Sequence, residues 1–143
     1  MALEGLWLAQ AMKHSPWLYP TVETMHIWGI GMLFGSVVVM DLRVLGFGRT
    51  LNLSDLSRLG IVVAVIGFGL AVLTGSLMFI AQASELISSR LFILKMCMIF
   101  LLLANAVILR MRTIDNGMSK MQALLSLAGW ASVIGMGRWL AYV

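Results

Sequence analysis

Four ionisable side chains inside or close to long apolar segments are the residues of this 143-residue chain whose types and positions could do chemistry. Glu23 and His26 form an E-x-x-H pattern, and Lys95 and Arg138 stand in later apolar segments. Ionisable residues inside a membrane span are costly, so they usually face the interior of a helix bundle and have a function there. The chemistry open to this set is ion pairing, or ligation of a metal or haem by the imidazole.

Sulfur-bearing side chains are the second chemical feature. Methionine accounts for 12 residues, and Cys97 is the single cysteine. Because thioether and thiolate sulfur select Cu(I), Met78, Met98 and Cys97 are candidate metal ligands together with His26. Methionine is also a flexible apolar filler that needs no ligand. The sulfur residues expected in the same half of the membrane as His26 are Met25, Met78, Met96, Cys97, Met98 and Met136.

The segments that must position these residues are helices in lipid. Hydrophobic residues make up 61% of the chain and charged residues 11%, an imbalance that a soluble core of this size could not bury. Each of four apolar segments is close to the ~20 residues that cross the hydrocarbon. They cover about residues 21–45, 57–81, 90–109 and 121–142. The sequence predicts one all-α domain over residues 1–143, an integral membrane four-helix bundle.

A short amphipathic stretch precedes the first span. Residues 3–14 are too few to cross a bilayer, so they predict an N-terminal helix that lies in the interface. Pro16 and Pro20 predict a break between this helix and the first span, and Trp17 and Tyr19 are candidate aromatic anchors.

Basic residues predict the orientation. Most of them are in or beside the first and third loops, namely Arg43, Arg49, Arg58, Arg110, Arg112 and Lys120. The positive-inside rule then places these loops in the cytoplasm and both termini on the outer side of the membrane. The same clustering explains the net charge of +4, so we expect no nucleic-acid partner.

Small and polar residues mark the faces on which the spans are expected to pack. The predicted inward faces are Glu23, His26, Ile30, Leu33, Val37 and Asp41; Gly60, Ala64, Gly67, Ala71, Thr74 and Met78; Lys95, Met98, Leu102 and Asn105; and Ala128, Ala131, Gly135 and Arg138. With the predicted topology, Glu23, His26, Met78, Lys95 and Arg138 converge near the periplasmic side. Gly31 and Gly35 form a G-x-x-x-G on another face, a second contact within the bundle or between subunits.

Three interpretations of this convergence stay open. In a structural site, Glu23 forms an ion pair with Lys95 or Arg138, and His26 joins the network. In a haem b site, His26 is the axial ligand, and Met78, His14 or the His26 of a second subunit is the sixth ligand. Lys95 and Arg138 then neutralise the propionates. In a copper site, His26, Met78, Cys97 and Met98 bind the metal. At the other end of the first span, Asp41 is expected to pair with Arg58 or Arg110.

Three runs carry a resemblance: WLYPTVETMHIWGIGMLFGSVVVMDLRVLG, LFILKMCMIFLLLANAVILR and GWASVIGMGRWLAYV. The chain resembles an uncharacterised family of small four-span bacterial inner-membrane proteins. It is more distantly similar to copper-resistance D membrane proteins and b-type cytochrome four-helix bundles. The resemblance implies a four-span fold in the inner membrane. Where the family pattern often closes the third span with a histidine, this chain has Arg110, which departs from a two-histidine site.

The predicted function is therefore a haem b- or metal-binding subunit for electron transfer. The alternatives are a copper-handling membrane protein and a non-catalytic accessory subunit of a larger membrane complex. In each case the partners are the bilayer and either further copies of the chain or other subunits. Because the sequence lacks a catalytic triad, a phosphate-binding glycine loop and a zinc-spaced His/Cys group, we expect no independent catalytic activity.

Overall fold

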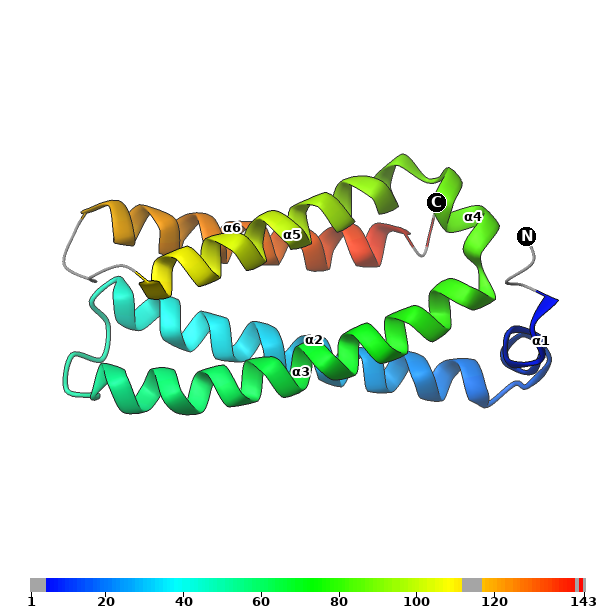
Figure 1. The fold of residues 1–143 in the computed structure, drawn as a ribbon, viewed down its shortest axis with the longest axis horizontal. Helices are drawn as coiled ribbons and strands as arrows, with labels where there is room; N and C mark the ends of the chain where they lie inside the picture. The colour runs from blue at the N-terminus through cyan, green and yellow to red at the C-terminus, as the bar shows by residue number, and fades with distance from the viewer. Residues whose placement is uncertain (1–4, 112–116, 141, 143) are drawn as a thin grey trace. The chain divides into compact units, whose positions relative to one another are not determined.

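The regular structure of the described chain is helical throughout. The structure is a computed structural model that describes residues 5–111, 117–140 and 142. Its helices are α1 (Trp7–His14), α2 (Leu18–Val44), α3 (Leu53–Ala81), α4 (Ala83–Ser88), α5 (Arg90–Met111) and α6 (Gly117–Leu140) (Figure 1). The helices α2, α3, α5 and α6 are long and apolar enough to cross a membrane. The predicted all-helical chain with four long apolar helices is therefore confirmed.

The chain forms two compact units, and α2 and α3 run through both. The first unit consists of Met1–Ser36 and Ile61–Ser89, and the second of Val37–Gly60 and Arg90–Val143. The first unit thus holds α1, α4, the beginning of α2 and most of α3. The second unit holds the end of α2, the beginning of α3, and all of α5 and α6.

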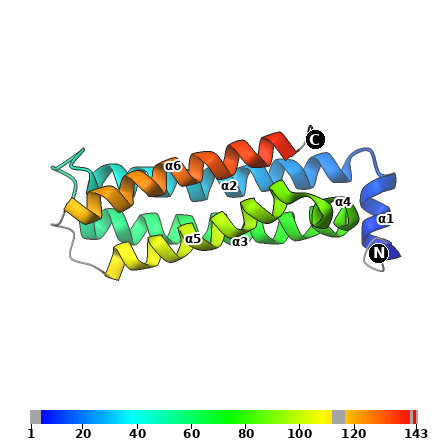
Figure 2. The same cartoon turned by 90° about the horizontal axis from the view of Figure 1, so that it is seen from above.

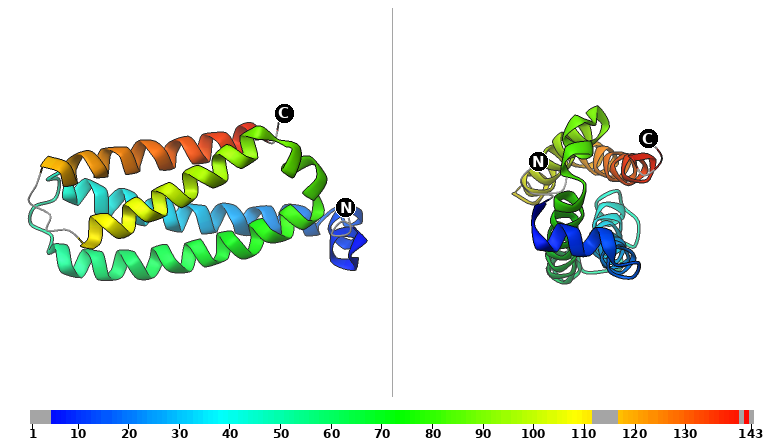
Figure 3. Two further views of the ribbon diagram at one scale, coloured as in Figure 1. Left: turned by 45° about the horizontal axis from the view of Figure 1, so that its top comes forward. Right: turned by 90° about the vertical axis from the view of Figure 1, so that its right-hand side faces the viewer.

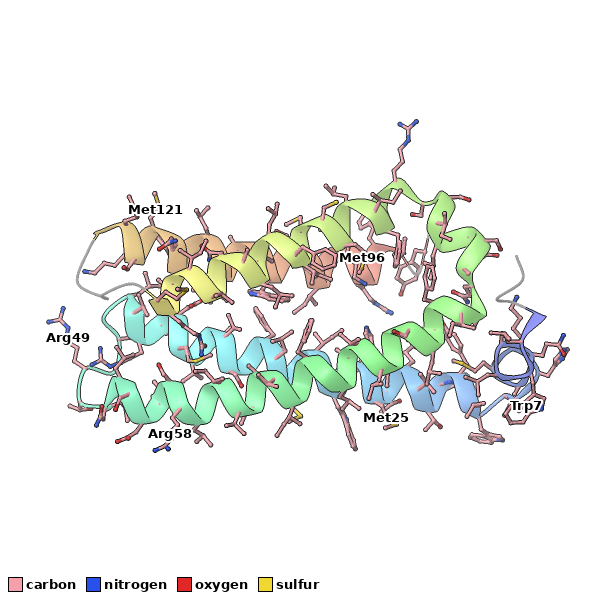
Figure 4. All side chains as sticks on the ribbon, in the orientation of Figure 1. Trp7, Met25, Arg49, Arg58, Met96 and Met121 are labelled. Carbon is pink, nitrogen blue, oxygen red and sulfur yellow. The ribbon has the colours of Figure 1, made fainter. Side chains whose placement is uncertain are left out.

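In the first unit, α1 crosses the end of the α2–α3 pair where α2 begins and α3 ends (Figures 1 and 2). Met12 of α1 packs with Val22 and Ala81, and all three side chains are buried. Tyr19, Leu77 and Met78 surround this cluster. On the opposite face of α1, Trp7 is 79% exposed and projects outward (Figure 4). The helix is thus amphipathic, as the sequence indicates.

The contact between α2 and α3 in the first unit is made backbone to backbone. A Cβ atom added to Gly67 would lie 2.7 Å from Gly29 O and from Leu33 N. One added to Gly29 would lie 2.8 Å from Ala71 N. Such distances leave no room for a side chain, so the two helices can approach this closely only because both positions are glycine. The predicted small-residue face of α3 is confirmed at these positions.

Gly31 and Gly35 of α2 do not form such a contact. A Cβ added to Gly31 or Gly35 would meet no other described atom within 4 Å, helix backbone aside. The G-x-x-x-G of α2 therefore makes no close packing contact within the first unit. A contact between subunits stays a prediction.

The beginning of α2 corrects one prediction. The predicted break between the N-terminal helix and the first span is present at residues 15–17, which include Pro16. Pro20 does not belong to the break, because α2 starts at Leu18 rather than near Thr21 and includes Pro20. The first N–H groups of a helix have no intrahelical carbonyl partner, so proline in the first turn costs no hydrogen bond. Outside the helix, Ser15 Oγ accepts a hydrogen bond from Leu18 N–H at 3.3 Å.

In the second unit, parts of all four long helices meet. Val44 of α2, Leu109 of α5 and Ala123 of α6 form a buried apolar cluster. The α5 and α6 helices pack along each other (Figure 3), and Leu102 of α5 lies where a side chain on Gly129 would stand. The loop between α2 and α3 turns at Gly46 and Gly48, which have φ angles of +103° and +60°. These left-handed angles favour glycine.

The segment after α3 also departs from the prediction. Residues 84–89 were expected to form a loop, but most of them belong to the short helix α4. Several predicted features lie outside the described residues: Leu3 at the start of the interfacial helix, Arg112 among the basic loop residues, and Asp115 and Asn116 in the third loop.

Candidate functional site

His26 of α2 is held by a hydrogen bond to Thr74 of α3, within the first unit. His26 Nδ1 lies 2.9 Å from Thr74 Oγ1. The Thr74 hydroxyl also lies 2.6 Å from the Leu70 carbonyl oxygen, to which it donates its one proton. The Thr74 oxygen must then accept from the Nδ1–H of His26. In the neutral imidazole this assigns the lone pair to Nε2.

Gly75, the residue after Thr74, provides the surface on which the imidazole lies. A Cβ added to Gly75 would be 3.1 Å from His26 Cε1, so a larger residue would push the ring aside. Thr74 itself is only 3% exposed. Two consecutive residues of α3 therefore fix both the position and the tautomer of His26. The sequence placed Thr74 on the inward face of the second span but did not identify it as the partner of His26.

Two other predicted site residues belong to the same unit. Glu23 is half-buried, one turn before His26 on α2. Met78 is half-buried in apolar contacts with the cluster of Met12, Val22 and Ala81. Among the remaining sulfur candidates of this unit, Met25 is 41% exposed (Figure 4).

The remaining predicted site residues belong to the second unit. A Cβ added to Gly137 would be 3.5 Å from Lys95 Nζ, so the ammonium group lies beside α6, one residue before Arg138. Arg138 is exposed, and its guanidinium lies 4.9 Å from the centre of the Tyr142 ring and donates to the Tyr142 hydroxyl at 2.5 Å. Cys97 is an exposed free thiol, and Met98 is half-buried. The predicted convergence of these residues with His26 stays a prediction.

The other potential metal ligands of the described chain indicate what His26 could bind. No group of three or more His, Cys, Asp or Glu side chains in residues 5–111, 117–140 and 142 could hold a metal ion. A metal ion bound by protein alone commonly takes three or four such ligands. Haem brings its own four nitrogen ligands and can be held by one histidine. Methionine sulfurs add further donors, and the copper site stays a prediction.

The fold and the site define a small all-helical chain whose four long apolar helices suit a multi-pass membrane protein. Comparison with protein-family models, curated proteins and solved structures finds no match. The resemblance to small four-span inner-membrane proteins thus stays a prediction. The function is therefore inferred from the geometry around His26.

Proposed function

We propose that this chain is a redox subunit of the bacterial inner membrane that holds haem b through Nε2 of His26. The observation that carries the proposal is the 2.9 Å contact between His26 Nδ1 and Thr74 Oγ1. A histidine that ligates a metal almost always donates its other ring N–H to a fixed acceptor, which sets the tautomer and the ring orientation. Thr74 supplies that acceptor, because its own proton is directed to Leu70.

Each residue of the proposed site has a separate task. His26 binds the iron, Thr74 orients the imidazole and raises its basicity, and Gly75 leaves room for the ring. When bound, the haem supplies one-electron redox chemistry. Lys95 and Arg138 are proposed to neutralise the propionates, and Glu23 to balance their charge. Because one histidine suffices, the sixth-ligand role of Met78 is not required.

The placement in the membrane belongs to the same proposal. The four long helices span the bilayer, and α1 lies in the interface with Trp7 toward the lipid headgroups. The excess of basic residues in the first and third loops places those loops in the cytoplasm and both termini in the periplasm. Exposed apolar side chains along α5, such as Phe100 and Leu101, are compatible with lipid contact.

The test is a reduced-minus-oxidised visible spectrum of protein purified in mild detergent from its native membrane, with metal analysis of the same sample. We expect a Soret band and a sharp α band, both lost in His26→Ala. Thr74→Val should keep the haem but change its reduction potential, because Nδ1–H loses its acceptor. Thr24→Val is the matched control: its hydroxyl also donates to the carbonyl four residues back, Pro20 O at 2.8 Å, but from an exposed position.

Other results would replace the proposal with a named alternative. A colourless protein with stoichiometric copper, weakened by Met78→Leu and Cys97→Ser, would indicate the copper-handling protein. A sample without haem or metal that co-purifies with larger partners would indicate the accessory subunit.

A further inference from the structure

Asp41 is a buried carboxylate at the other end of α2, within the second unit. It is 5% exposed. Ser126 of α6, which is 2% exposed, hydrogen-bonds to the carboxylate, and the positive charge of Arg110 on α5 acts on it electrostatically. The structure thus brings Arg110, one of the two predicted partners, to Asp41. This group belongs to a different unit from His26 and needs no haem.

The hydrogen bonding of the residues around Asp41 is incomplete. Asp41 Oδ2 is buried and has no hydrogen-bond partner in the described chain. The same holds for Gln122 Oε1 and Trp130 Nε1 on α6. Buried polar atoms are nearly always bonded, so an exception calls for a ligand or a water. Gln122, Ser126 and Trp130 are spaced four residues apart and share the face of α6 that meets Asp41.

The chemistry of the group selects a proton as the ligand. Hard cations such as Mg²⁺ and Ca²⁺ take six or more oxygen ligands, whereas the two unbonded acceptors here are Asp41 Oδ2 and Gln122 Oε1. The charge of Arg110 also opposes a metal cation. A proton needs only one lone pair. We propose that Asp41 is a proton-binding site in the membrane-spanning part of the second unit, with Arg110 as its counter-charge and Ser126 as its positioning residue.

The proton-binding step conserves atoms and charge. On acidification a hydronium ion gives a proton to the lone pair of Asp41 Oδ2: one O–H bond forms, the O–H bond of the hydronium ion breaks, and a neutral water is left. The Asp41–Arg110 group changes from net zero to +1. Arg110, which also contacts Met40 Sδ at 2.8 Å, stays positive but loses its counter-charge.

Among the described residues, the charge that acts on Asp41 is that of Arg110. Arg110 acts on it from α5, Ser126 bonds to it from α6, and Gly60 of α3 packs against Met40, the residue before Asp41. The charge state of the site therefore depends on Asp41 and Arg110. Removing either side chain tests a different part of the proposal.

The test is infrared difference spectroscopy of the full-length protein in liposomes of neutral lipid, between neutral and acidic pH. We expect a carboxylic acid C=O band on acidification that is lost in Asp41→Asn. The band should be kept in Glu23→Gln and in Asp55→Asn, the control for an exposed carboxyl at the first turn of α3. Persistence of the full band in Asp41→Asn, or its loss in Glu23→Gln, overturns the proposal.

Two further variants test the proposal if Asp41→Asn does not fold. Ser126→Ala should keep the band but change its frequency, because the hydroxyl that bonds the carboxyl is removed. Arg110→Gln should make the band appear at a pH higher by about one unit, since the charge that favours the carboxylate is gone. A band that neither variant changes would come from another carboxyl and would overturn the proposal.

Discussion

The two ends of the α2–α3 pair hold their polar groups in opposite ways. In the first unit, His26 donates to Thr74, which donates to Leu70, and the helices touch through Gly29 and Gly67. In the second unit, Asp41 bonds to Ser126, but its other oxygen has no partner in the described chain. Glycines form the helix contact in the first unit, whereas side chains fill the contact in the second unit.

This difference suggests two kinds of site. A polar side chain whose tautomer and orientation are already set is suited to hold a ligand that must not move. A buried carboxylate with unused bonding capacity is suited to take up a small ligand and release it. Removing the hydrogen-bond partner should destabilise the first kind of site, whereas replacing the carboxylate of the second kind by an apolar side chain should not.

The largest effect is expected where the helices touch. Gly67→Ala places a Cβ 2.7 Å from Gly29 O and Leu33 N, backbone atoms that cannot move aside without separating α2 from α3. We expect a loss of about 2–3 kcal/mol in the free energy of unfolding, measured by denaturant titration in detergent with circular dichroism. Gly69→Ala, which meets nothing described within 4 Å, is the control and should be neutral or stabilising. Equal losses in both variants would contradict the packing.

The next effect tests the satisfied polar pair. Thr74→Val keeps the shape of the side chain but leaves His26 Nδ1–H without its acceptor. The free energy of unfolding should fall by about 1–2 kcal/mol, the cost of leaving a buried donor unbonded. Thr24→Val, at an exposed position, should cost less. An unchanged midpoint for Thr74→Val would mean that the hydrogen bond does not hold His26.

Asp41→Leu should not lower the free energy of unfolding. It replaces an incompletely bonded carboxylate by a larger apolar side chain of the same branching, and the exposed Arg110 is not left as a buried charge. The desolvation cost of the carboxylate is removed, which offsets the loss of the Ser126 bond, so we expect stability to stay the same or rise by about 1 kcal/mol. The same titration measures it. A loss as large as that of Thr74→Val would show that Asp41 is a structural residue.

The smallest effect is expected for a satisfied bond inside the second unit. Asn105 of α5 donates through Nδ2 to the Gln122 carbonyl oxygen of α6 at 3.3 Å. Polar bonds between membrane helices average about 0.6 kcal/mol, so Asn105→Leu should cost about that much in the same assay. If Asn105→Leu left the free energy of unfolding unchanged, as expected for Asp41→Leu, then bonded and unbonded polar groups of this unit would not differ in their contribution to stability.

The sequence allowed several of these features to be predicted for physical reasons. Runs of about 20 apolar residues specify long helices whatever their neighbours are, and Gly67 with Ala71 marked a packing face because small side chains permit close approach. Asn105 was predicted to lie on a packing face, and it bonds to the neighbouring helix. These signals are local, and each can be read from one segment.

Other features depend on how one helix is rotated against another, which no single segment specifies. The acceptor for His26 could have been any hydroxyl on the second span, and the partner of Asp41 is Ser126, far along the chain. The Pro20 error has a local cause: the same residue breaks a helix interior but fits its first turn. The predicted convergence of His26 with Lys95 and Arg138 depends on a rotation of this kind as well.

The unequal lengths of the helices have a consequence for the choice of bilayer. With a rise of 1.5 Å per residue, α2 and α3, of 27 and 29 residues, are about 40 and 43 Å long, while α5, of 22 residues, is about 33 Å long. In the proposed placement in a bilayer, a hydrocarbon layer about 30 Å thick would match α5 nearly upright, whereas α2 and α3 would tilt or extend into the headgroups. Hydrophobic mismatch would therefore act mainly on α2, which carries both His26 and Asp41, and on α3, which carries Thr74. Thinning the membrane should strain this pair first.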